Sequence, residues 1–295
     1  MGREKRFAAI DIGSNAVRLL LSGVMEEKGE IFFKKAAFIR MPVRLGEDAF
    51  LRGEIRDKRI KQLEHTMIGF KNLIEAYNPE DYRACATSAM REASNSGEIC
   101  SRIKKNADID IHIIDGKEEA EIIFSNSQWA DTSVNATDVF VDVGGGSTEI
   151  SILKNNEGVS NSFNIGTIRL MRDMVSSNDW HEMELWVKKE ISPLKILSAR
   201  ASGGNIHKIL SLSGNKKAEQ VSINQMRRVR KLLKSYTVTE RIIKLGLKPD
   251  RADVILPAFK IYFSIMKWAN LHTYKVPQMG LADGIIRQLH KKNPV

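Results

Sequence analysis

The 295-residue chain is poor in cysteine: it has only Cys85 and Cys100, which allow neither a disulfide framework nor a zinc pattern. We expect both thiols to be reduced and partly buried. The chain also lacks any uninterrupted apolar run near the ~20 residues that a membrane-spanning helix needs. Its charged first residues lead directly into an apolar strand pattern, without the apolar segment of a signal peptide. These features predict a cytoplasmic protein that does not bind a membrane.

Acidic residues are outnumbered, because 36 Asp and Glu stand against 46 Lys and Arg and give a net charge of +10. A basic balance indicates a polyanionic partner but does not distinguish nucleic acid from a phosphate-rich small molecule. Residues 224–236 are strongly basic and have helical apolar spacing, so we expect an amphipathic helix. Its basic face is either solvated or a track for a polyanion. Interleaved aromatics are missing, which argues against a dedicated nucleic-acid surface.

Residues 139–152 read VFVDVGGGSTEISI, a pattern of strand, glycine turn and strand. Glycines let backbone N–H groups approach an anion closely, so such a turn can form a nest around a phosphate. The flanking acids Asp142 and Glu149 suit Mg²⁺, which is usually held by one or two carboxylates plus a phosphate. A plain hairpin is the alternative. The predicted phosphate-binding residues of this turn are Gly144, Gly145, Gly146 and Ser147.

A second copy of this pattern lies near the N-terminus, where residues 7–21 read FAAIDIGSNAVRLLL. An apolar run, Asp11, a glycine and small polar residues precede another apolar run. Two such units predict a doubled architecture with a phosphate held between its halves. In this copy Gly13, Ser14 and Asn15 would bind phosphate, and Asp11 would bind the metal directly or through water.

Together with these two loops, ATSAMREASN at residues 86–95 and IIDGKEEAEIIF at 113–124 resemble the four signatures of the exopolyphosphatase / guanosine pentaphosphate phosphohydrolase family. The resemblance runs from about residue 7 to the final LADGIIRQL. It implies the α/β fold of the actin-like ATPase superfamily, with two ribonuclease-H-like domains and a cleft between them. We expect the first domain at residues 1–125, with a helix at 282–295 returning to it, and the second domain at 126–281.

Three glutamates, Glu118, Glu119 and Glu121, begin a predicted helix, where acids are ordinary because they complement the helix dipole. The residues alone do not select one, but the resemblance implies that Glu119 is the general base. Arg91 lies in a matched segment; it is either a solvated helical arginine or, as the resemblance favours, a catalytic guanidinium that binds the phosphate chain.

Ser202 and Gly203 precede another apolar helical pattern, and they form either a further anion site or a plain strand-to-helix turn. Among the other elements, we expect a loop at 40–50 that contains Arg44, a helix at 57–77, a helix cap at Ser88, and a crossing into the second domain at 132–137.

The resemblance implies a Mg²⁺-dependent phosphoanhydride hydrolase that releases terminal orthophosphate from inorganic polyphosphate, from guanosine pentaphosphate, or from both. Its partners would be polyphosphate or a phosphorylated guanosine nucleotide, and a homodimer is left open. Two alternatives remain: a small-molecule kinase of the same superfamily, and a non-catalytic sensor that binds a phosphorylated alarmone. The candidate base argues against the sensor, and the absence of a separate adenosine signature argues against the kinase.

Overall fold

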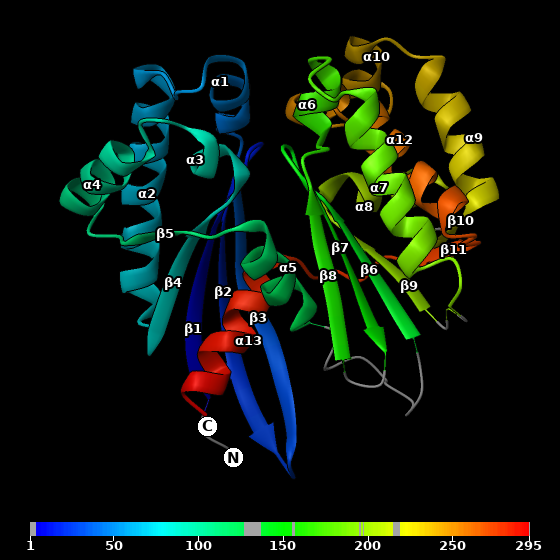
Figure 1. The fold of residues 1–295 in the computed structure, drawn as a ribbon. Helices are drawn as coiled ribbons and strands as arrows, with labels where there is room; N and C mark the ends of the chain where they lie inside the picture. Colours follow the sequence, from blue (N-terminus) through cyan, green and yellow to red (C-terminus); the bar gives the residue numbers. More distant parts are fainter. Residues whose placement is uncertain are drawn as a thin grey trace. The chain divides into compact units, whose positions relative to one another are not determined.

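The structure, a computed structural model, describes residues 4–126, 137–154, 157–194, 196, 198–214 and 219–294. The chain divides into two compact units (Figure 1): unit 1 is Met1–Gln128 with Leu281–Val295, and unit 2 is Trp129–Gly280. Residues 132–136 of the predicted crossing lie outside the described residues. The predicted limits of the two domains stay a prediction.

Unit 1 contains a five-stranded sheet in the order β3-β2-β1-β4-β5. Its central strand β1 pairs antiparallel with β2 and parallel with β4. Residues 7–12 of β1 are buried on both faces, as expected for a central strand covered by helices. The strands are β1 (Lys5–Ile12), β2 (Val17–Glu27), β3 (Glu30–Met41), β4 (Asp81–Ala86) and β5 (Ile111–Ile113).

The helices of unit 1 are α1 (Leu45–Arg52), α2 (Asp57–Tyr77), α3 (Ser88–Glu92), α4 (Ser96–Ala107), α5 (Gly116–Phe124) and α13 (Leu281–Lys292). The predicted helix at 57–77 is confirmed as α2. The last helix, α13, packs on β1 and α5 although it comes from the far end of the chain (Figure 1). Gly284 allows this approach, because a Cβ there would overlap the carbonyl oxygen of Ile122.

Unit 2 contains a six-stranded sheet in the order β10-β11-β9-β6-β7-β8. Strands β8, β7 and β6 are antiparallel neighbours, and β9 and β11 continue the sheet in parallel, which is the pairing pattern of the five strands of unit 1. Strand β10 is added antiparallel at the edge. The α/β prediction with a doubled architecture is therefore confirmed. The strands are β6 (Thr137–Val143), β7 (Thr148–Lys154), β8 (Glu157–Phe163), β9 (Ser198–Ser202), β10 (Gln220–Ser222) and β11 (Thr273–Lys275).

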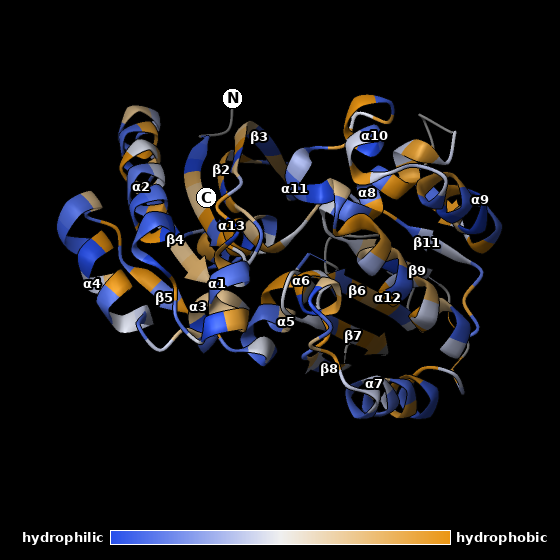
Figure 2. Cartoon of the chain, turned by 90° about the horizontal axis from the view of Figure 1, so that it is seen from above, coloured by the Kyte–Doolittle hydropathy of each residue, from blue (hydrophilic) through white to orange (hydrophobic). Residues whose placement is uncertain are grey.

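The helices of unit 2 pack around α12 (Ile255–Trp268), which contacts α6, α7, α8, α9 and β6. Its apolar side chains are buried among these elements, and it lies amid the other helices of the unit in Figure 2. The remaining helices are α6 (Thr167–Met171), α7 (Ser177–Glu190), α8 (Gly204–Leu212), α9 (Ile223–Lys234), α10 (Val238–Ile243) and α11 (Pro249–Ala252).

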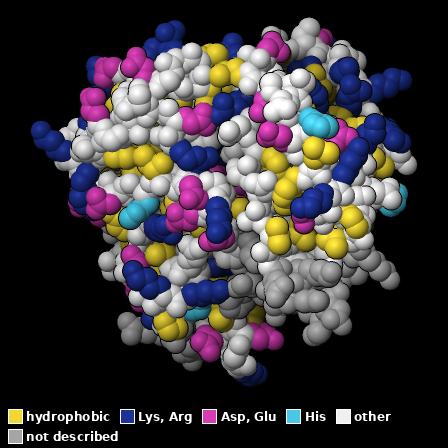
Figure 3. All heavy atoms as spheres, in the orientation of Figure 1, with side chains coloured by type: hydrophobic (Ala, Val, Ile, Leu, Met, Phe, Trp, Pro, Cys, Tyr) yellow, Lys and Arg dark blue, Asp and Glu magenta, His cyan; other side chains and the backbone are white. Residues whose placement is uncertain are grey.

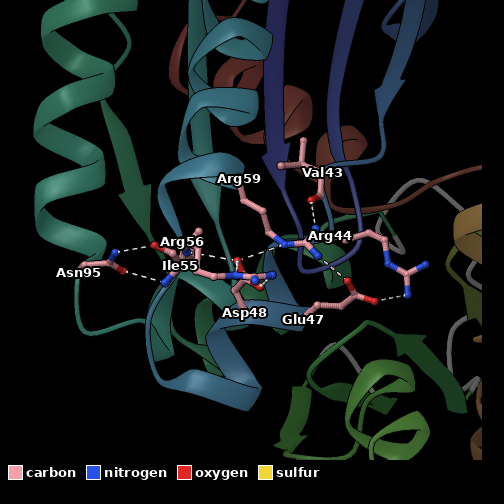
Figure 4. A network of polar contacts seen from close by, with 8 residues as sticks. All are labelled: Val43, Arg44, Glu47, Asp48, Ile55, Arg56, Arg59 and Asn95. Carbon is pink, nitrogen blue, oxygen red and sulfur yellow. Dashed lines mark hydrogen bonds and ion pairs between the residues drawn. The ribbon is translucent and has the colours of Figure 1, made fainter.

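The predicted loop at 40–50 is wrong, because α1 begins at Leu45. Arg44 adopts the left-handed conformation with φ 57° and turns the chain into this helix. The first turn is anchored by ion pairs (Figure 4): Arg59 contacts Glu47 at 2.5 Å, and Arg56 contacts Asp48 at 2.8 Å. These contacts come from α2 and its N-cap, so local turn propensity could not predict them.

Two smaller expectations can be compared with the structure. Thr87, rather than Ser88, is the N-cap of α3, and Ser88 is buried. Both cysteines are free thiols; Cys100 is half-buried as expected, whereas Cys85 is fully buried. Burial raises the pKa of the Cys85 thiol to about 12, so this group stays protonated. In the part of the chain that the structure describes, no helix is long and apolar enough to cross a membrane.

Candidate active site

The first candidate site is the hairpin loop of unit 1, residues 13–16 between β1 and β2. The Gly13 N–H donates to the Ala16 carbonyl oxygen at 3.1 Å and closes the loop. Asp11 and Arg18 lie opposite each other in the two strands, and Arg18 Nη1 contacts Asp11 Oδ2 at 2.5 Å. The predicted metal ligand Asp11 is therefore already neutralised by a cation that the sequence reasoning did not single out.

Backbone N–H groups at the start of α1 hold two carbonyl groups of this loop. The Gly46 N–H donates to the Ser14 carbonyl at 2.8 Å, and the Arg44 N–H donates to the Asn15 carbonyl at 3.1 Å. In a planar trans peptide the C=O and the next N–H point in opposite directions. The N–H groups of Asn15 and Ala16 therefore point away from the start of α1. The hydroxyl groups of Ser14 and Ser88 lie 2.8 Å apart, which ties the loop to α3.

The second candidate site is the hairpin loop of unit 2, residues 144–147 between β6 and β7. The Gly144 N–H donates to the Ser147 carbonyl at 2.9 Å, as in the first loop. Three successive carbonyls are then held from the side of α6. The donors are the Thr167 N–H to Gly144 at 3.0 Å, the Ile168 N–H to Gly145 at 2.8 Å, and Arg169 Nε to Gly146 at 2.8 Å.

By the same peptide geometry, the N–H groups of Gly145, Gly146 and Ser147 point away from α6. Three successive donors on one side of a loop form the kind of nest that binds anions. Gly166 makes this clamp possible, because a Cβ there would overlap the backbone of Gly145 and Gly146.

Asp142 and Glu149 lie directly opposite each other on β6 and β7, and on the other side of β6 Ser202 of β9 is the residue paired with Asp142. Ser202 Oγ donates to Asp142 Oδ1 at 2.5 Å, and Ser162 Oγ donates to Glu149 Oε1 at 2.9 Å. Gly203 adopts φ 102°, and a Cβ there would lie 3.5 Å from Asp142 Oδ1. Each carboxylate is thus held by a serine hydroxyl, Asp142 by Ser202 at the end of β9 and Glu149 by Ser162 of β8.

Tyr262 of α12 holds the backbone next to Asp142 in place, because its hydroxyl donates to the Ser202 carbonyl at 2.5 Å. Complete burial and the negative charge of Asp142 raise the pKa of Tyr262 well above its usual value. The phenol therefore stays protonated and remains a donor at neutral pH.

The donor set of unit 2 fits Mg²⁺. Carboxylates are the hard oxygen ligands that Mg²⁺ prefers, and this ion usually takes one or two of them together with substrate phosphates and waters. Among the described residues, no group of three or more His, Cys, Asp or Glu side chains could hold a metal ion. The pair formed by Asp142 and Glu149 provides two such carboxylates, which suit an ion whose other ligands come from a phosphate and water.

The three glutamates at the start of α5 have different surroundings. Glu119 is buried, with 7% of its surface exposed, and its Oε2 lies 3.7 Å from Arg91 Nη1. Glu118 pairs with Arg83 at 2.7 Å, and Glu121 is exposed. Arg91 also donates from Nη1 to the Ile114 carbonyl at 2.7 Å, which fixes its guanidinium near Glu119.

The structure thus gathers the predicted residues into two groups, one in each unit. Unit 1 contains Asp11, Gly13, Ser14, Asn15, Arg91 and Glu119. Unit 2 contains Asp142, Gly144, Gly145, Gly146, Ser147, Glu149, Ser202 and Gly203. Arg18, Ser162 and Arg169 were missed. Of these three, only Arg18 could have been recognised from the sequence, because it stands seven residues after Asp11, as Glu149 stands seven residues after Asp142.

The chain belongs to the Ppx/GppA phosphatase family, whose family model matches residues 24–293. Two solved structures have the same fold over nearly the whole chain. One is an exopolyphosphatase from Cytophaga hutchinsonii, with a TM-score of 0.85, 24% identity and 98% coverage of each chain. The other is the Aquifex aeolicus Ppx/GppA family member, with a TM-score of 0.78, 22% identity and coverage of 99% of this chain and 100% of that chain. The two-domain actin-like ATPase fold is therefore confirmed.

Two curated relatives are also similar. Exopolyphosphatase 1 of Mycobacterium tuberculosis is 23% identical over 303 residues, covering 95% of this chain and 87% of that protein. A bifunctional 3-dehydroquinate synthase/phosphatase of Fusobacterium nucleatum is 29% identical over 202 residues, which cover 64% of this chain. This chain spans only 30% of that bifunctional relative's length.

Proposed function

We propose that the protein is a Mg²⁺-dependent phosphoanhydride hydrolase that releases terminal orthophosphate from inorganic polyphosphate, with guanosine pentaphosphate as a second substrate of the same site. The observation that carries this proposal is the loop at 144–147, where three successive carbonyls are held from α6 and three N–H groups point the other way beside two carboxylates. Such a loop suits the terminal phosphate of a polyanion.

Asp142 and Glu149 would hold the Mg²⁺ ion in this proposal. The ion would supply positive charge to the phosphate oxygens, the main requirement of phosphoryl transfer besides positioning. The hydroxyls of Ser202 and Ser162 keep the two carboxylates oriented through their hydrogen bonds. In unit 1, Gly13, Ser14 and Asn15 would contribute further phosphate contacts. Asp11 would contact the ion directly or through water, with Oδ2 engaged by Arg18.

Glu119 would accept a proton from the attacking water. Its burial favours this role, because a base that is shielded from bulk water keeps a fixed geometry. Arg91 would hold the phosphate chain in line. Its guanidinium has five N–H donors, of which Nη1 is used on the Ile114 carbonyl, so others can meet phosphate oxygens.

Phosphate release should be measured with Mg²⁺ from polyphosphates of graded length and from guanosine pentaphosphate in parallel. We expect release from polyphosphate, at a rate that increases with chain length, and slower release from the nucleotide. Faster release from the nucleotide would reverse the proposed preference. Absence of release from both substrates would overturn the proposal, and ATP-dependent phosphorylation of a small acceptor would then identify a kinase.

A further inference from the structure

Helix α9 carries cations that the proposed hydrolysis does not use. Its sequence INQMRRVRKLLK contains no acidic residue. Four of its cations occupy positions i, i+3, i+4 and i+7, so they lie on one face of the helix. We call these four the basic stripe: Arg227, Arg230, Lys231 and Lys234.

All four side chains of the basic stripe are exposed, while Met226, Val229 and Leu233 of the same helix are buried in the core of unit 2. Lys and Arg side chains gather over α9 at the right-hand edge of Figure 3, and the outward side of α9 is hydrophilic in Figure 2. The helix is therefore anchored by its apolar side and presents its charge to the solvent.

The basic stripe has no acidic partner among the described residues, unlike several other helix cations; Arg227 Nη1 donates only to the neutral Asn224 Oδ1, at 3.1 Å. Lys188 pairs with Glu184 at 2.5 Å, Lys244 pairs with Glu240 at 2.7 Å, and Lys61 pairs with Asp57 at 2.8 Å. No ion pair joins the basic stripe to any other described residue. Like charges one helical turn apart repel each other, and an anion bound along the stripe would relieve that repulsion.

The aromatic rings around the basic stripe are covered by cations. The Arg227 guanidinium lies 5.9 Å from the centre of the Phe263 ring, and that of Arg230 lies 6.0 Å from the centre of the buried Phe259 ring. Lys244 lies 5.3 Å from the centre of the Tyr236 ring. Nucleic-acid bases need accessible rings on which to stack. The surface therefore suits a phosphate chain without bases.

We propose that the basic stripe is a second binding site, where an extended inorganic polyphosphate chain is held away from its reacting end. Arg227 and Lys234 are separated by about 10 Å along the helix axis, which gives a line of charge rather than a pocket. Helix α8 follows Gly203 beside Asp142 and packs against α9, so the stripe lies one helix away from the proposed metal site. Binding to the stripe does not depend on hydrolysis, but a resulting preference for long chains rests on the proposed function.

The test compares two triple variants with the same change in net charge. The stripe variant carries Arg227→Gln, Lys231→Gln and Lys234→Gln. The control variant carries Lys61→Gln, Lys188→Gln and Lys189→Gln, all at exposed cations that already pair with acids and lie outside the surface around the basic stripe. Binding of long-chain polyphosphate is measured without Mg²⁺ across a salt series, and kcat and KM are measured for long chains and for tripolyphosphate.

In the stripe variant we expect binding of long chains about 10-fold weaker at low salt, and a log–log salt slope lower by about 2, since each phosphate contact contributes roughly 0.7. The KM for long chains should rise, with kcat and the tripolyphosphate KM unchanged. The control variant should bind like the wild type. An unchanged melting temperature in both variants confirms that the fold is intact.

Equal losses in both variants would overturn the proposal, because net charge alone would explain them. Wild-type binding of single-stranded RNA or of anionic vesicles as tight as that of polyphosphate, with the same loss in the stripe variant, would also overturn it. Unchanged polyphosphate binding in the stripe variant would refute the second site. If wild-type protein hydrolyses neither chain but the binding difference persists, the second site stands and the proposed function fails.

Discussion

The two β-hairpins at the centres of the two sheets share their strand pairing and loop closure but carry different charges. Each places an aspartate one residue before the end of its first strand, and each loop is closed by a glycine N–H bonded to a carbonyl, at 3.1 Å in unit 1 and 2.9 Å in unit 2. The residue opposite the aspartate differs, because Arg18 faces Asp11 whereas Glu149 faces Asp142. The first hairpin is neutral there, and the second carries two negative charges.

This difference indicates how a duplicated fold acquires distinct roles. A salt bridge within the hairpin satisfies Asp11 without any ligand, whereas two facing carboxylates repel each other and are better satisfied by a cation. In unit 1 the candidate residues Arg91 and Glu119 lie instead on α3 and α5, the helices that follow β4 and β5, and their side chains are 3.7 Å apart. We therefore expect unit 1 to contribute proton transfer and unit 2 to contribute the metal ion and the phosphate loop.

The largest expected effect is that of Glu119→Gln in unit 1. A positioned general base contributes about 10²–10⁴-fold to a rate, and Gln cannot accept the proton of water. We expect kcat for phosphate release to fall by that factor, with substrate binding nearly unchanged, because the amide has the size of the carboxylic group. Steady-state kinetics and equilibrium binding measure the two quantities separately.

Glu118→Gln is the matched control, since Glu118 occupies the neighbouring position in the same helix turn, with a side chain that is 42% exposed and pairs with Arg83. It should retain kcat within about 2-fold, because surface ion pairs contribute little. Turnover by the Glu119→Gln protein at the wild-type rate would remove the proposed base from unit 1.

The next effect concerns the facing carboxylates of unit 2. Glu149→Gln should abolish most of the increase in melting temperature that Mg²⁺ and a phosphate ligand produce together, because one of two carboxylate ligands is lost. Without Mg²⁺ the same variant should be more stable by about 0.2–1 kcal/mol, since the repulsion of like charges across the strands is relieved. Thermal unfolding with and without Mg²⁺ gives both numbers.

Asp11→Asn tests the other half of the comparison. It should retain the Mg²⁺-dependent increase in melting temperature, because Asp11 is paired with Arg18 rather than facing a second acid. If Asp11→Asn loses this increase and Glu149→Gln keeps it, the metal belongs to unit 1 and the assignment of roles is reversed.

Much of this arrangement could be predicted from the sequence because it depends on local patterns. Alternating and continuous apolar runs around Asp11 and Asp142 gave both hairpins, and helical spacing gave α2. The choice of Glu119 among three glutamates came from the family resemblance, since all three fit the start of a helix equally well.

The rest depends on contacts between residues far apart in the chain. Helix α1 was missed because its first turn is stabilised by Arg56 and Arg59 and by the left-handed conformation of Arg44 (Figure 4). The clamp of α6 on the second loop requires Gly166 to lie against Gly145, about twenty residues away in the sequence. No periodicity encodes such an approach.

A smaller effect is expected when the salt bridge of the first hairpin is removed. Arg18→Gln leaves the buried Asp11 carboxylate, 5% exposed, without its strongest cationic contact. Hydrogen bonds to charged groups contribute about 1.5–3 kcal/mol, so we expect the free energy of unfolding to fall by about 2 kcal/mol. Urea unfolding followed by circular dichroism measures this change.

The double variant Arg18→Gln with Asp11→Asn provides the control. Because it removes both charges, it should recover most of the lost stability, as expected for two groups that interact directly. Equal destabilisation of the single and double variants would show that the bridge does not hold the first hairpin together.

The smallest effect is a pH dependence confined to unit 1. His290 of α13 is buried and lies edge-on to the rings of Phe7 and Phe33, with centroid distances of 6.3 and 5.8 Å. Burial lowers its pKa, against an opposing contribution from Glu26 and a supporting one from Lys5. The folded state thus prefers the neutral imidazole, so its contribution to stability is complete above the unfolded pKa of about 6.5 and is lost as the pH falls below it.

We therefore expect amide hydrogen exchange in β1, β2 and α13 to accelerate between pH 7.5 and pH 5.5, after correction for the intrinsic rate, with no such change in β6 and β7. The described histidines of unit 2 are exposed or half-buried, which gives that unit no comparable group: His181, His207 and His272. His290→Gln should remove the acceleration, because Gln does not titrate. Acceleration of equal size in both units, or its persistence in this variant, would place the pH-sensitive groups elsewhere and end this contrast between the units.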